Sequence, residues 1–266
     1  MKTYRAHQDV SVLNDYLEVP GLGFLAVNAF VLHSAQPVVI DTGLGLPDRT
    51  FVADLAEVID PSDVRWIWLT HPDRDHTGGL FALLDAAPQA RVVTTFVGAG
   101  MMSTECPLPM DRVYLLNPGQ SLDVGDRSLT GFRPPLFDNA ATVGIFDRST
   151  GVCFSSDCFG APMASADLAT VDDIAAAPPD ELRAAQLLWA SVDSPWIHDV
   201  DPAKFAESLT PLHEFDPSSV FSTHLPPSHD ATTMLLANIS GAPAVEPFVG
   251  PDQAALEAML REFEPA

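Results

Sequence analysis

The sequence feature that most constrains the fold is the stretch of residues 70–79, in which two histidines and two aspartates fall within six consecutive positions. These four residues are His71, Asp73, Asp75 and His76. The stretch follows an apolar run at residues 64–69 that is typical of a buried strand, and it ends in a Gly-Gly pair. Imidazole and carboxylate groups are common metal ligands, so a ligand-rich loop after a buried strand indicates a metal site. Considered alone, the stretch fits an ordinary polar turn with two solvated histidines equally well.

The spacing of apolar residues predicts an α/β fold with a block of hairpins in the middle of the chain. We expect strands at residues 24–32, 37–40, 64–69, 91–95, 113–116, 120–124, 128–132, 142–146, 152–156 and 218–222. We expect helices at residues 47–59, 79–87, 180–190, 202–212 and 252–263, and a loop at 101–110. The alternation of strands and helices up to residue 95 is the basis of the α/β assignment.

The composition limits the possible partners of the chain. Its 266 residues, 47% of them hydrophobic, are enough for one large globular domain. A formal net charge of −23 argues against nucleic acid and anionic membranes, because both require a basic surface. No apolar stretch is long enough for a membrane span and the N-terminus lacks a signal-peptide core, so we expect a cytoplasmic protein. Cys106, Cys153 and Cys158 lack disulfide or metal-site spacing and are expected to be reduced, mostly buried thiols.

Polar residues directly follow several of the predicted strands. Asp41, His71, Asp157 and His224 each come after an apolar run. In α/β sheets, sites gather where strands end, so these side chains can converge on one site. Asp41, which precedes a Thr-Gly pair, fits a simple turn closed by its own side chain. It also fits a carboxylate that orients a metal-bound histidine.

Other conspicuous side chains are expected to have structural roles. Trp189, Trp196, His198 and His213 lie in a proline-containing segment, and we expect them to pack in a covering layer and not to bind metal. Arg133, in a Gly-Phe-Arg-Pro-Pro stretch, could bind an anionic substrate. A surface arginine in a loop is the better interpretation of this residue.

Four segments together resemble the metallo-β-lactamase superfamily. They are residues 39–43 (Val-Ile-Asp-Thr-Gly), 70–79, 155–157 (Ser-Ser-Asp) and 222–224 (Ser-Thr-His), in the order found in that family. The resemblance implies a four-layer αββα sandwich with two metal ions at the rim of its two sheets. We therefore predict one α/β (α+β) domain over residues 1–266, with its core at about 20–227, a helical covering segment at 160–217 and a C-terminal helix at 252–263.

The same resemblance implies a set of metal ligands. The implied ligands are His71, Asp73 and Asp138 for one ion and Asp75, His76 and His224 for the other, with Asp157 bridging both. Asp41 would orient a histidine. Two positions depart from the usual pattern. The second histidine of the usual His-x-His-x-Asp-His block is Asp73 here, and a gap-free alignment back from Asp157 places Asp138 where a histidine usually lies.

Three histidines and four carboxylates favour iron, or manganese, over zinc. A carboxylate at the second position of the block also occurs, as glutamate, in the flavodiiron proteins and in stand-alone oxygen-binding di-iron proteins. Residues 157–160 (Asp-Cys-Phe-Gly) are similar to the bridging segment of those proteins. The resemblance thus implies a di-iron protein that binds or reduces dioxygen. We expect no flavodoxin-like domain after residue 266, so a redox reaction would need an external electron donor.

Two other functions remain open at this point. A metal-dependent hydrolase would attack a small-molecule substrate with a metal-bridging hydroxide, and Asp75 could steer that nucleophile. Zinc would be possible in this case. The third possibility is a non-catalytic domain with a degenerate metal site, since the fold alone does not determine the chemistry. A homo-oligomer is compatible with all three.

Overall fold

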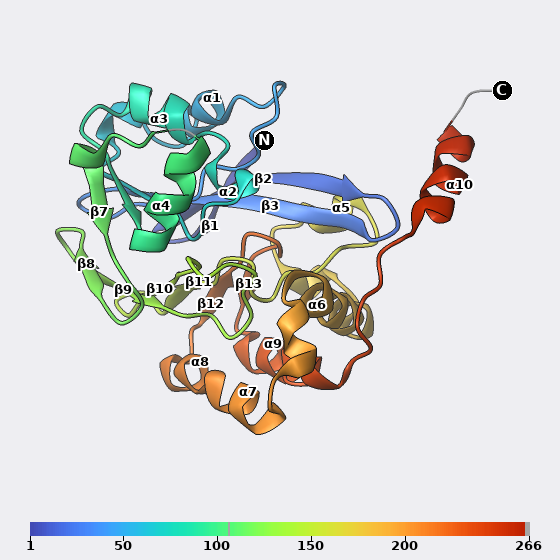
Figure 1. The fold of residues 1–266 in the computed structure, drawn as a ribbon. Helices are drawn as coiled ribbons and strands as arrows, with labels where there is room; N and C mark the ends of the chain where they lie inside the picture. Colours follow the sequence, from blue (N-terminus) through green and yellow to red (C-terminus); the bar gives the residue numbers. More distant parts are fainter. Residues whose placement is uncertain (106, 264–266) are drawn as a thin grey trace.

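The computed structural model describes residues 1–105 and 107–263. Its strands form two sheets that pack face to face, and helices cover the outer face of each sheet (Figure 1). This arrangement confirms the predicted four-layer αββα sandwich. The expectation for Cys106 lies outside the described residues, whereas Cys153 and Cys158 are buried free thiols.

The first sheet has seven strands, which follow one another in sequence order across the sheet. The strands are β1 Lys2–His7, β2 Val10–Val19, β3 Gly23–Leu32, β4 Val38–Ile40, β5 Trp66–Trp68, β6 Arg91–Thr94 and β7 Val113–Leu115. Neighbours from β1 to β4 pair antiparallel, and those from β4 to β7 pair parallel. The predicted β3–β4 hairpin is confirmed. The sequence analysis missed β1 and β2, although β2 and β3 form the long blue hairpin of Figure 1.

The second sheet has six strands in the order β13-β12-β11-β10-β9-β8. They are β8 Ser121–Asp123, β9 Ser128–Phe132, β10 Gly144–Asp147, β11 Val152–Phe154, β12 Ser219–Phe221 and β13 Ser228–His229. Only β11 and β12 pair parallel, and the other neighbours pair antiparallel. Because parallel strands end at the same edge of a sheet, the loops after β11 and β12 lie side by side.

Helices form the two outer layers. The α-helices are α1 Phe51–Ala56, α2 Arg74–Thr77, α3 Leu80–Ala86, α4 Phe96–Glu105, α5 Ala166–Ala169, α6 Pro179–Asp193, α7 Pro202–Ser208, α8 Thr210–Phe215, α9 Thr232–Ile239 and α10 Gln253–Phe263. The 3₁₀ helices are Pro61–Asp63, Met110–Arg112, Ile174–Ala176, Pro195–Asp199 and Ala242–Ala244. Side chains of α1, α3 and α4 pack on the first sheet, and those of α6 to α9 pack on the second. α10 projects away from both sheets (Figure 1). No helix among the described residues is long and apolar enough to cross a membrane.

Alternation along the strands joins the layers. In β3, Phe30 and Leu32 belong to the apolar core between the two sheets, while Ala29 and Val31 belong to the core under α1, α3 and α4. Such strands are buried on both faces, which explains why they are continuous apolar runs in the sequence. Because both faces of these strands pack in apolar cores, the polar residues that follow the strands lie in loops at one rim of the sandwich.

Three predicted elements differ from the structure. Residues 101–105 are helical, as part of α4, and not a loop. This helix was missed because the apolar residues of α4 do not lie on one buried face. Its first residue, Phe96, has an exposed side chain, so the helical pattern is weak in the sequence. α1 begins at Phe51, later than predicted. The helix expected at 202–212 is divided into α7 and α8, because Pro211 cannot continue the hydrogen bonding of α7.

Candidate metal centre

Loops that follow four strands meet at one rim between the two sheets. Asp41 follows β4, the segment 71–76 follows β5, Asp157 follows β11 and His224 follows β12. Asp138, between β9 and β10, reaches the same place. The residues that the sequence analysis singled out at strand ends are therefore brought together.

The segment after β5 is held against the loop after β4 by main-chain contacts. The main-chain N–H of Thr42 donates to the carbonyl of His76 at 2.7 Å. A side chain at Gly78 would overlap the main chain of residues 43–45, so the close approach requires glycine. This contact brings Asp41 to the imidazole of His76, with 2.8 Å between Oδ2 and Nδ1.

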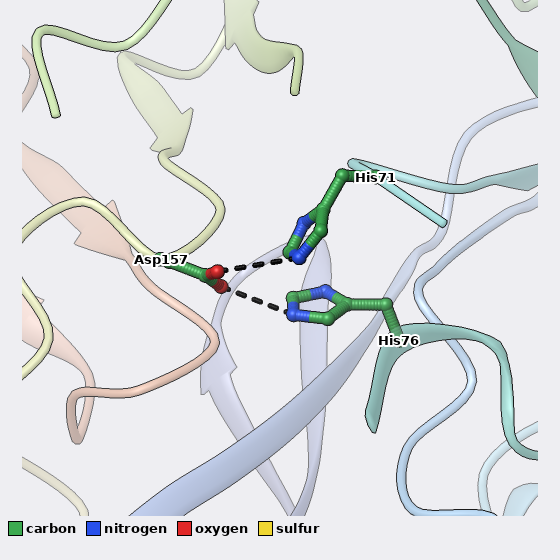
Figure 2. A group of neighbouring side chains, drawn as sticks. All are labelled: His71, His76 and Asp157. Atoms are coloured by element: carbon green, nitrogen blue, oxygen red, sulfur yellow. Dashed lines mark ion pairs between the residues drawn. The ribbon is translucent and has the colours of Figure 1, made fainter. Parts of the chain in front are cut away.

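Asp157 lies at the centre of the group. Its Oδ2 is 3.3 Å from Nε2 of His71, and its Oδ1 is 3.0 Å from Nε2 of His76. Figure 2 shows the carboxylate facing both imidazoles. The same Oδ1 is 3.3 Å from Nε2 of His224. The preceding residue, Ser156, has a φ of 55°, in the sparsely populated left-handed region, so the loop accepts backbone strain to hold this carboxylate in place.

The hydrogen bonds of His76 and His224 determine which ring nitrogen carries the proton. His76 Nδ1 donates to Asp41 Oδ2 at 2.8 Å, and His224 Nδ1 donates to the carbonyl of Ala26 at 2.8 Å. Because these oxygens only accept, Nδ1 carries the hydrogen in both rings. Nε2 of each ring is then available as a ligand, and both Nε2 atoms point to Asp157.

His71 is oriented by a chain of hydroxyl groups. Its Nδ1 lies 3.1 Å from Ser156 Oγ, which donates to Thr70 Oγ1 at 2.9 Å. Thr70 Oγ1 in turn donates to Asp41 Oδ2 at 2.8 Å. Each hydroxyl has one proton, so Ser156 can only accept from His71, whose Nε2 is left free. Asp41 thus supports two histidines, one directly and one through two hydroxyls.

Two buried atoms at the centre have no hydrogen-bond partner in the described part of the chain, namely His76 Nε2 and Asp157 Oδ1. Both are acceptors, and they face each other at 3.0 Å, so they repel unless a cation is present. Without metal, a proton can take this place. Burial would lower the pKa of His76, but neighbouring carboxylates, led by Asp41, raise it well above its usual value. A metal ion would replace that proton and use the same lone pairs.

The remaining ligands form two groups around Asp157. The first half consists of His71, Asp73 and Asp138, and the second half consists of Asp75, His76 and His224. Within each half the ligand atoms lie within 4.8 Å of one another. That spacing fits one ion per half, with bonds of about 2.0–2.3 Å after a small closure. All seven residues predicted as ligands are therefore close enough to bind two ions, and their binding of metal stays a prediction.

The two halves differ in charge. Burial, Asp157 and Asp73 raise the pKa of Asp138 to about 7. Burial would also raise the pKa of Asp75, but the adjacent His76 and His224 lower it well below its usual value. The carboxylate of the second half is thus matched by imidazoles, whereas the first half has an excess of negative charge.

The loop that carries Asp138 is held by its main chain. Trp196 Nε1 donates to the carbonyl of Phe137 at 2.7 Å, and Arg133 donates to the carbonyl of Ala140 at 2.8 Å. The guanidinium of Arg133 also lies over the ring of Phe137. Arg133, interpreted as a surface residue, is instead partly buried and supports this loop.

Asp193 was missed by the sequence analysis. It is the last residue of α6, and its ligand oxygen lies within 4.8 Å of ligand oxygens of Asp138 and Asp157. Burial, followed by these two carboxylates, raises the pKa of Asp193 to about 8. The sequence analysis selected polar residues that follow predicted strands, so it did not recognise an aspartate at the end of a helix. Trp189, one turn earlier, packs on His224 as a packing residue would and donates to the carbonyl of Asp157 at 3.2 Å.

A cavity of about 470 Å³ lies beside the aspartates of the β5–α3 segment. It is lined by Pro72, Asp73, Arg74, Asp75, Met101, Met102 and Thr104. α4, which was expected to be a loop at these positions, forms one wall. The cavity therefore adjoins a carboxylate from each half of the site.

The chain was compared with known proteins. The model of the metallo-beta-lactamase superfamily matches residues 22–162. The anaerobic nitric oxide reductase flavorubredoxin of Salmonella typhi is 26% identical over 134 residues, which are 50% of this chain and 28% of that protein. The chain thus spans only about a third of the length of the curated relatives it matches.

Two solved structures resemble the fold closely. Rubredoxin oxygen:oxidoreductase from Desulfovibrio gigas superimposes with a TM-score of 0.77 at 18% identity, covering 91% of this chain and 61% of that chain. A variant of the flavo di-iron protein from Thermotoga maritima gives a TM-score of 0.76 at 16% identity, covering 90% and 62%. At these identities the likeness concerns the fold.

Proposed function

The chain belongs to the metallo-beta-lactamase superfamily, and on that basis we propose that its two halves hold a pair of iron ions that bind or reduce dioxygen. The observation that carries the proposal is the pair of unpartnered buried acceptors, His76 Nε2 and Asp157 Oδ1. Their lone pairs face each other at 3.0 Å, and a metal ion at the point where the two halves meet would bind both. Each half adds three ligand atoms to an oxygen of Asp157.

The choice of iron rests on the chemistry of the ligands. Three imidazole nitrogens and four carboxylates form a harder set than the histidine-rich sites of zinc hydrolases, and they favour iron or manganese. The four negative charges match two divalent cations. Similar proteins are named flavo di-iron protein and rubredoxin oxygen:oxidoreductase, which supports iron as the metal and dioxygen as the small-molecule ligand.

The protein residues hold and orient the centre. Asp157 faces the first half with Oδ2 and the second half with Oδ1, so it would provide one oxygen ligand to each half. Asp41 keeps the Nδ1 proton on His76, which directs Nε2 inward. When bound, the iron pair would supply coordination positions for dioxygen and change oxidation state. Reduction of one dioxygen to two waters consumes four electrons and four protons, and we propose that an external donor supplies the electrons.

Metal analysis and oxygen consumption test the proposal together. Protein purified from iron-supplemented cells should contain two iron ions per chain, and it should consume dioxygen when a chemical reductant is added. Asp85→Asn removes one negative charge from an exposed position on α3, so it is the control for effects of purification and of net charge, and it should keep both ions. Stoichiometric zinc with negligible iron, and no consumption of dioxygen by iron-loaded protein, would contradict the proposal.

One observation favours the alternative, a metal-dependent hydrolase. The cavity beside Asp73 and Asp75 has a volume of about 470 Å³, which is more space than a diatomic molecule needs and is typical of small-molecule sites. In this case Asp75, at the cavity wall, would steer a metal-bridging hydroxide. Zinc-loaded and manganese-loaded protein should then hydrolyse members of a panel of chromogenic esters and phosphodiesters. Activity that Asp75→Asn abolishes, without loss of metal, would favour this alternative.

A further inference from the structure

The first part of β3 lies beside the loop that carries His224. β4 pairs only with residues 30–32 of β3, so the earlier part of β3 has an open edge on that side. The loop after β12 occupies this edge. The carbonyl of Ala26 accepts from His224 Nδ1 at 2.8 Å, and the main-chain N–H of Asn28 donates to the carbonyl of Thr223 at 2.9 Å. The position of His224, which follows a strand of the second sheet, therefore depends on a strand of the first.

Asn28 also holds this loop with its side chain. The residue is fully buried, and its Nδ2 donates to the carbonyls of Ser222 at 3.0 Å and Leu225 at 2.8 Å. These two residues lie on either side of His224 in the sequence. Among the described residues, neither carbonyl accepts another hydrogen bond. One carboxamide thus fixes the chain before and after a proposed metal ligand.

The surroundings of Asn28 favour an amide side chain. Asn28 lies on the face of β3 that also carries Phe30 and Leu32, which pack in the apolar core between the sheets. A buried polar side chain on such a face is unfavourable unless it is hydrogen-bonded. Asn14, at the paired position of β2, donates from Nδ2 to Asn28 Oδ1 at 2.7 Å. This bond sets the orientation of the amide, because it leaves both N–H groups of Asn28 for the loop.

We propose that Asn28 is a positioning residue for the metal ion of the second half. The inference rests on the proposed function, because it concerns the ligand that His224 supplies. Asn28 acts through the main chain and not as a ligand. It keeps the imidazole of His224 where Nδ1 reaches Ala26 and Nε2 reaches Asp157. An apolar residue of similar size would leave two buried carbonyls unpaired, so we expect the loop to shift.

The first half provides an internal comparison. His71 is oriented by the hydroxyls of Ser156 and Thr70, and among the described residues the side chain of Asn28 contacts neither hydroxyl. Loss of the Asn28 amide should therefore weaken the ion of the second half more than that of the first. If Asn28 only stabilised the fold, its loss would weaken both ions together.

Titration of metal-free protein with Zn²⁺, in a chelating buffer that sets the free Zn²⁺ concentration, tests the proposal. The imidazole ¹⁵N signals of His71 report the first half, and those of His224 report the second. Asn28→Leu should weaken the ion of the second half about 10- to 100-fold and that of the first half less than about threefold. If this variant does not fold, Asn28→Ser gives the same test, because one short hydroxyl cannot bond to both carbonyls.

Thr232→Val is the matched control. Thr232 is buried, and its hydroxyl donates to the carbonyl of Pro217 at 2.6 Å, in the loop before β12. The substitution removes a comparable hydrogen bond at the opposite end of the same strand, and both affinities should stay within about twofold of the wild type. If it weakens the ion of the second half as much as Asn28→Leu does, general destabilisation explains the loss and the proposal is wrong.

Hydrogen exchange of the metal-free protein gives a readout that needs no metal. The main-chain N–H of Ala161 donates to the carbonyl of His224 at 2.9 Å, and that of Asp230 donates to the carbonyl of Ser218 at 2.8 Å, before β12. Asn28→Leu should accelerate exchange at Ala161 at least about tenfold and leave exchange at Asp230 within about twofold of the wild type.

These measurements also separate the proposal from the proposed function. Unchanged exchange at Ala161, or an unchanged affinity of the second half, would overturn the role of Asn28. Equal weakening of both ions would make Asn28 a structural residue and not a positioning residue. A wild-type chain that binds no Zn²⁺, Mn²⁺ or iron would contradict the proposed function itself, and exchange at Ala161 would still show whether Asn28 holds the loop.

Discussion

The second half of the centre is held more firmly than the first. In the second half, His76 and His224 each donate from Nδ1 to a buried oxygen, of Asp41 and of Ala26 respectively. Both rings are buried, and their Nε2 atoms already point to the shared oxygen of Asp157. Little rearrangement is needed for a metal ion to bind here.

The first half is more exposed and more acidic. The side chains of Asp73 and Asp138 are 45% and 26% exposed, and each lies almost 4 Å from His71 Nε2. The loop of Asp138 is held through main-chain carbonyls, with no hydrogen bond from Arg133 or Trp196 to the carboxylate itself. Binding of metal must therefore order these side chains and overcome their repulsion. The comparison indicates a preorganised position for the ion of the second half and a weaker, harder position for the ion of the first half.

The largest effect is expected at the residue that both halves share. Asp157→Ala removes both carboxylate oxygens, one from each half, so both ions should bind at least about 100-fold more weakly. Metal content after dialysis, measured by elemental analysis, checks this. Asp85→Asn is the control and should retain two ions. Retention of two tightly bound ions by the Asp157 variant would show that the halves do not share a ligand.

The next effect should separate the halves. In Asp41→Asn the amide can donate to His76 Nδ1, which would move the ring proton to Nε2 and block the metal ligand. The ion of the second half should bind about 10- to 100-fold more weakly. The first half should change less, because two hydroxyls lie between Asp41 and His71. Competition with a chromophoric chelator resolves the two affinities.

Thr223→Val is the control for Asp41. It removes a longer hydrogen bond to the same oxygen, 3.3 Å from Thr223 Oγ1, and leaves the carboxylate in place. Its effect on both affinities should be less than about threefold. Equal weakening of both ions in Asp41→Asn would mean that the hydroxyl chain transmits the change fully, and the contrast between the halves would then be smaller than the contacts indicate.

The sequence predicted the layers, and it predicted that His76 and His224 lie at strand ends, for physical reasons. Strands buried on both faces are continuous apolar runs, and His76 and His224 follow such runs in local motifs. The position of Asp193 beside the site could not be predicted, because it depends on how α6 packs against the loop of Asp157. β1 was missed because its residues are polar and partly exposed, as on the edge strand of a sheet.

The pH dependence of the metal-free protein is a smaller effect, and it has a different electrostatic cause in each half. The pKa of Asp138 is raised to about 7 by burial and by its carboxylate neighbours, against about 3.9 in an unfolded chain. The folded state thus holds a proton that the unfolded state releases, and stability falls as pH rises from about 4 to 7. The pKa of His224 is raised to about 9, despite burial, by Asp157 and Asp75. Its stabilising charge is complete below pH 6.5 and is lost as pH rises to 9.

Both groups therefore make the metal-free protein less stable at high pH, and Tm should fall by roughly 5 °C between pH 5.5 and 9. Asp138→Asn should reduce this slope and raise Tm at pH 8. Asp75→Asn should lower Tm near pH 6, because it removes a partner of the charged His224. Thermal unfolding of the wild-type protein and of both variants, in a chelator-containing buffer at each pH, measures these changes in Tm. A rise in Tm for both variants, or a fall in Tm for both, would contradict the electrostatic difference between the halves.

The smallest effect concerns the support of the first half. Trp196→Phe keeps an aromatic ring against Phe137 but loses the hydrogen bond to its carbonyl, so the loop of Asp138 should be less well ordered. A lost neutral hydrogen bond of about 1 kcal/mol corresponds to about fivefold weaker binding of the ion in the first half. The second half should not change.

Trp66→Phe is the matched control. Its indole donates a hydrogen bond at 2.9 Å to Gln36, in a part of the first sheet that is remote from the site. If both variants weaken the first ion equally, general destabilisation and not the loop explains the loss. If only Trp196→Phe weakens the ion of the first half, then the affinity of that half depends on the hydrogen bond that holds the main chain of the Asp138 loop.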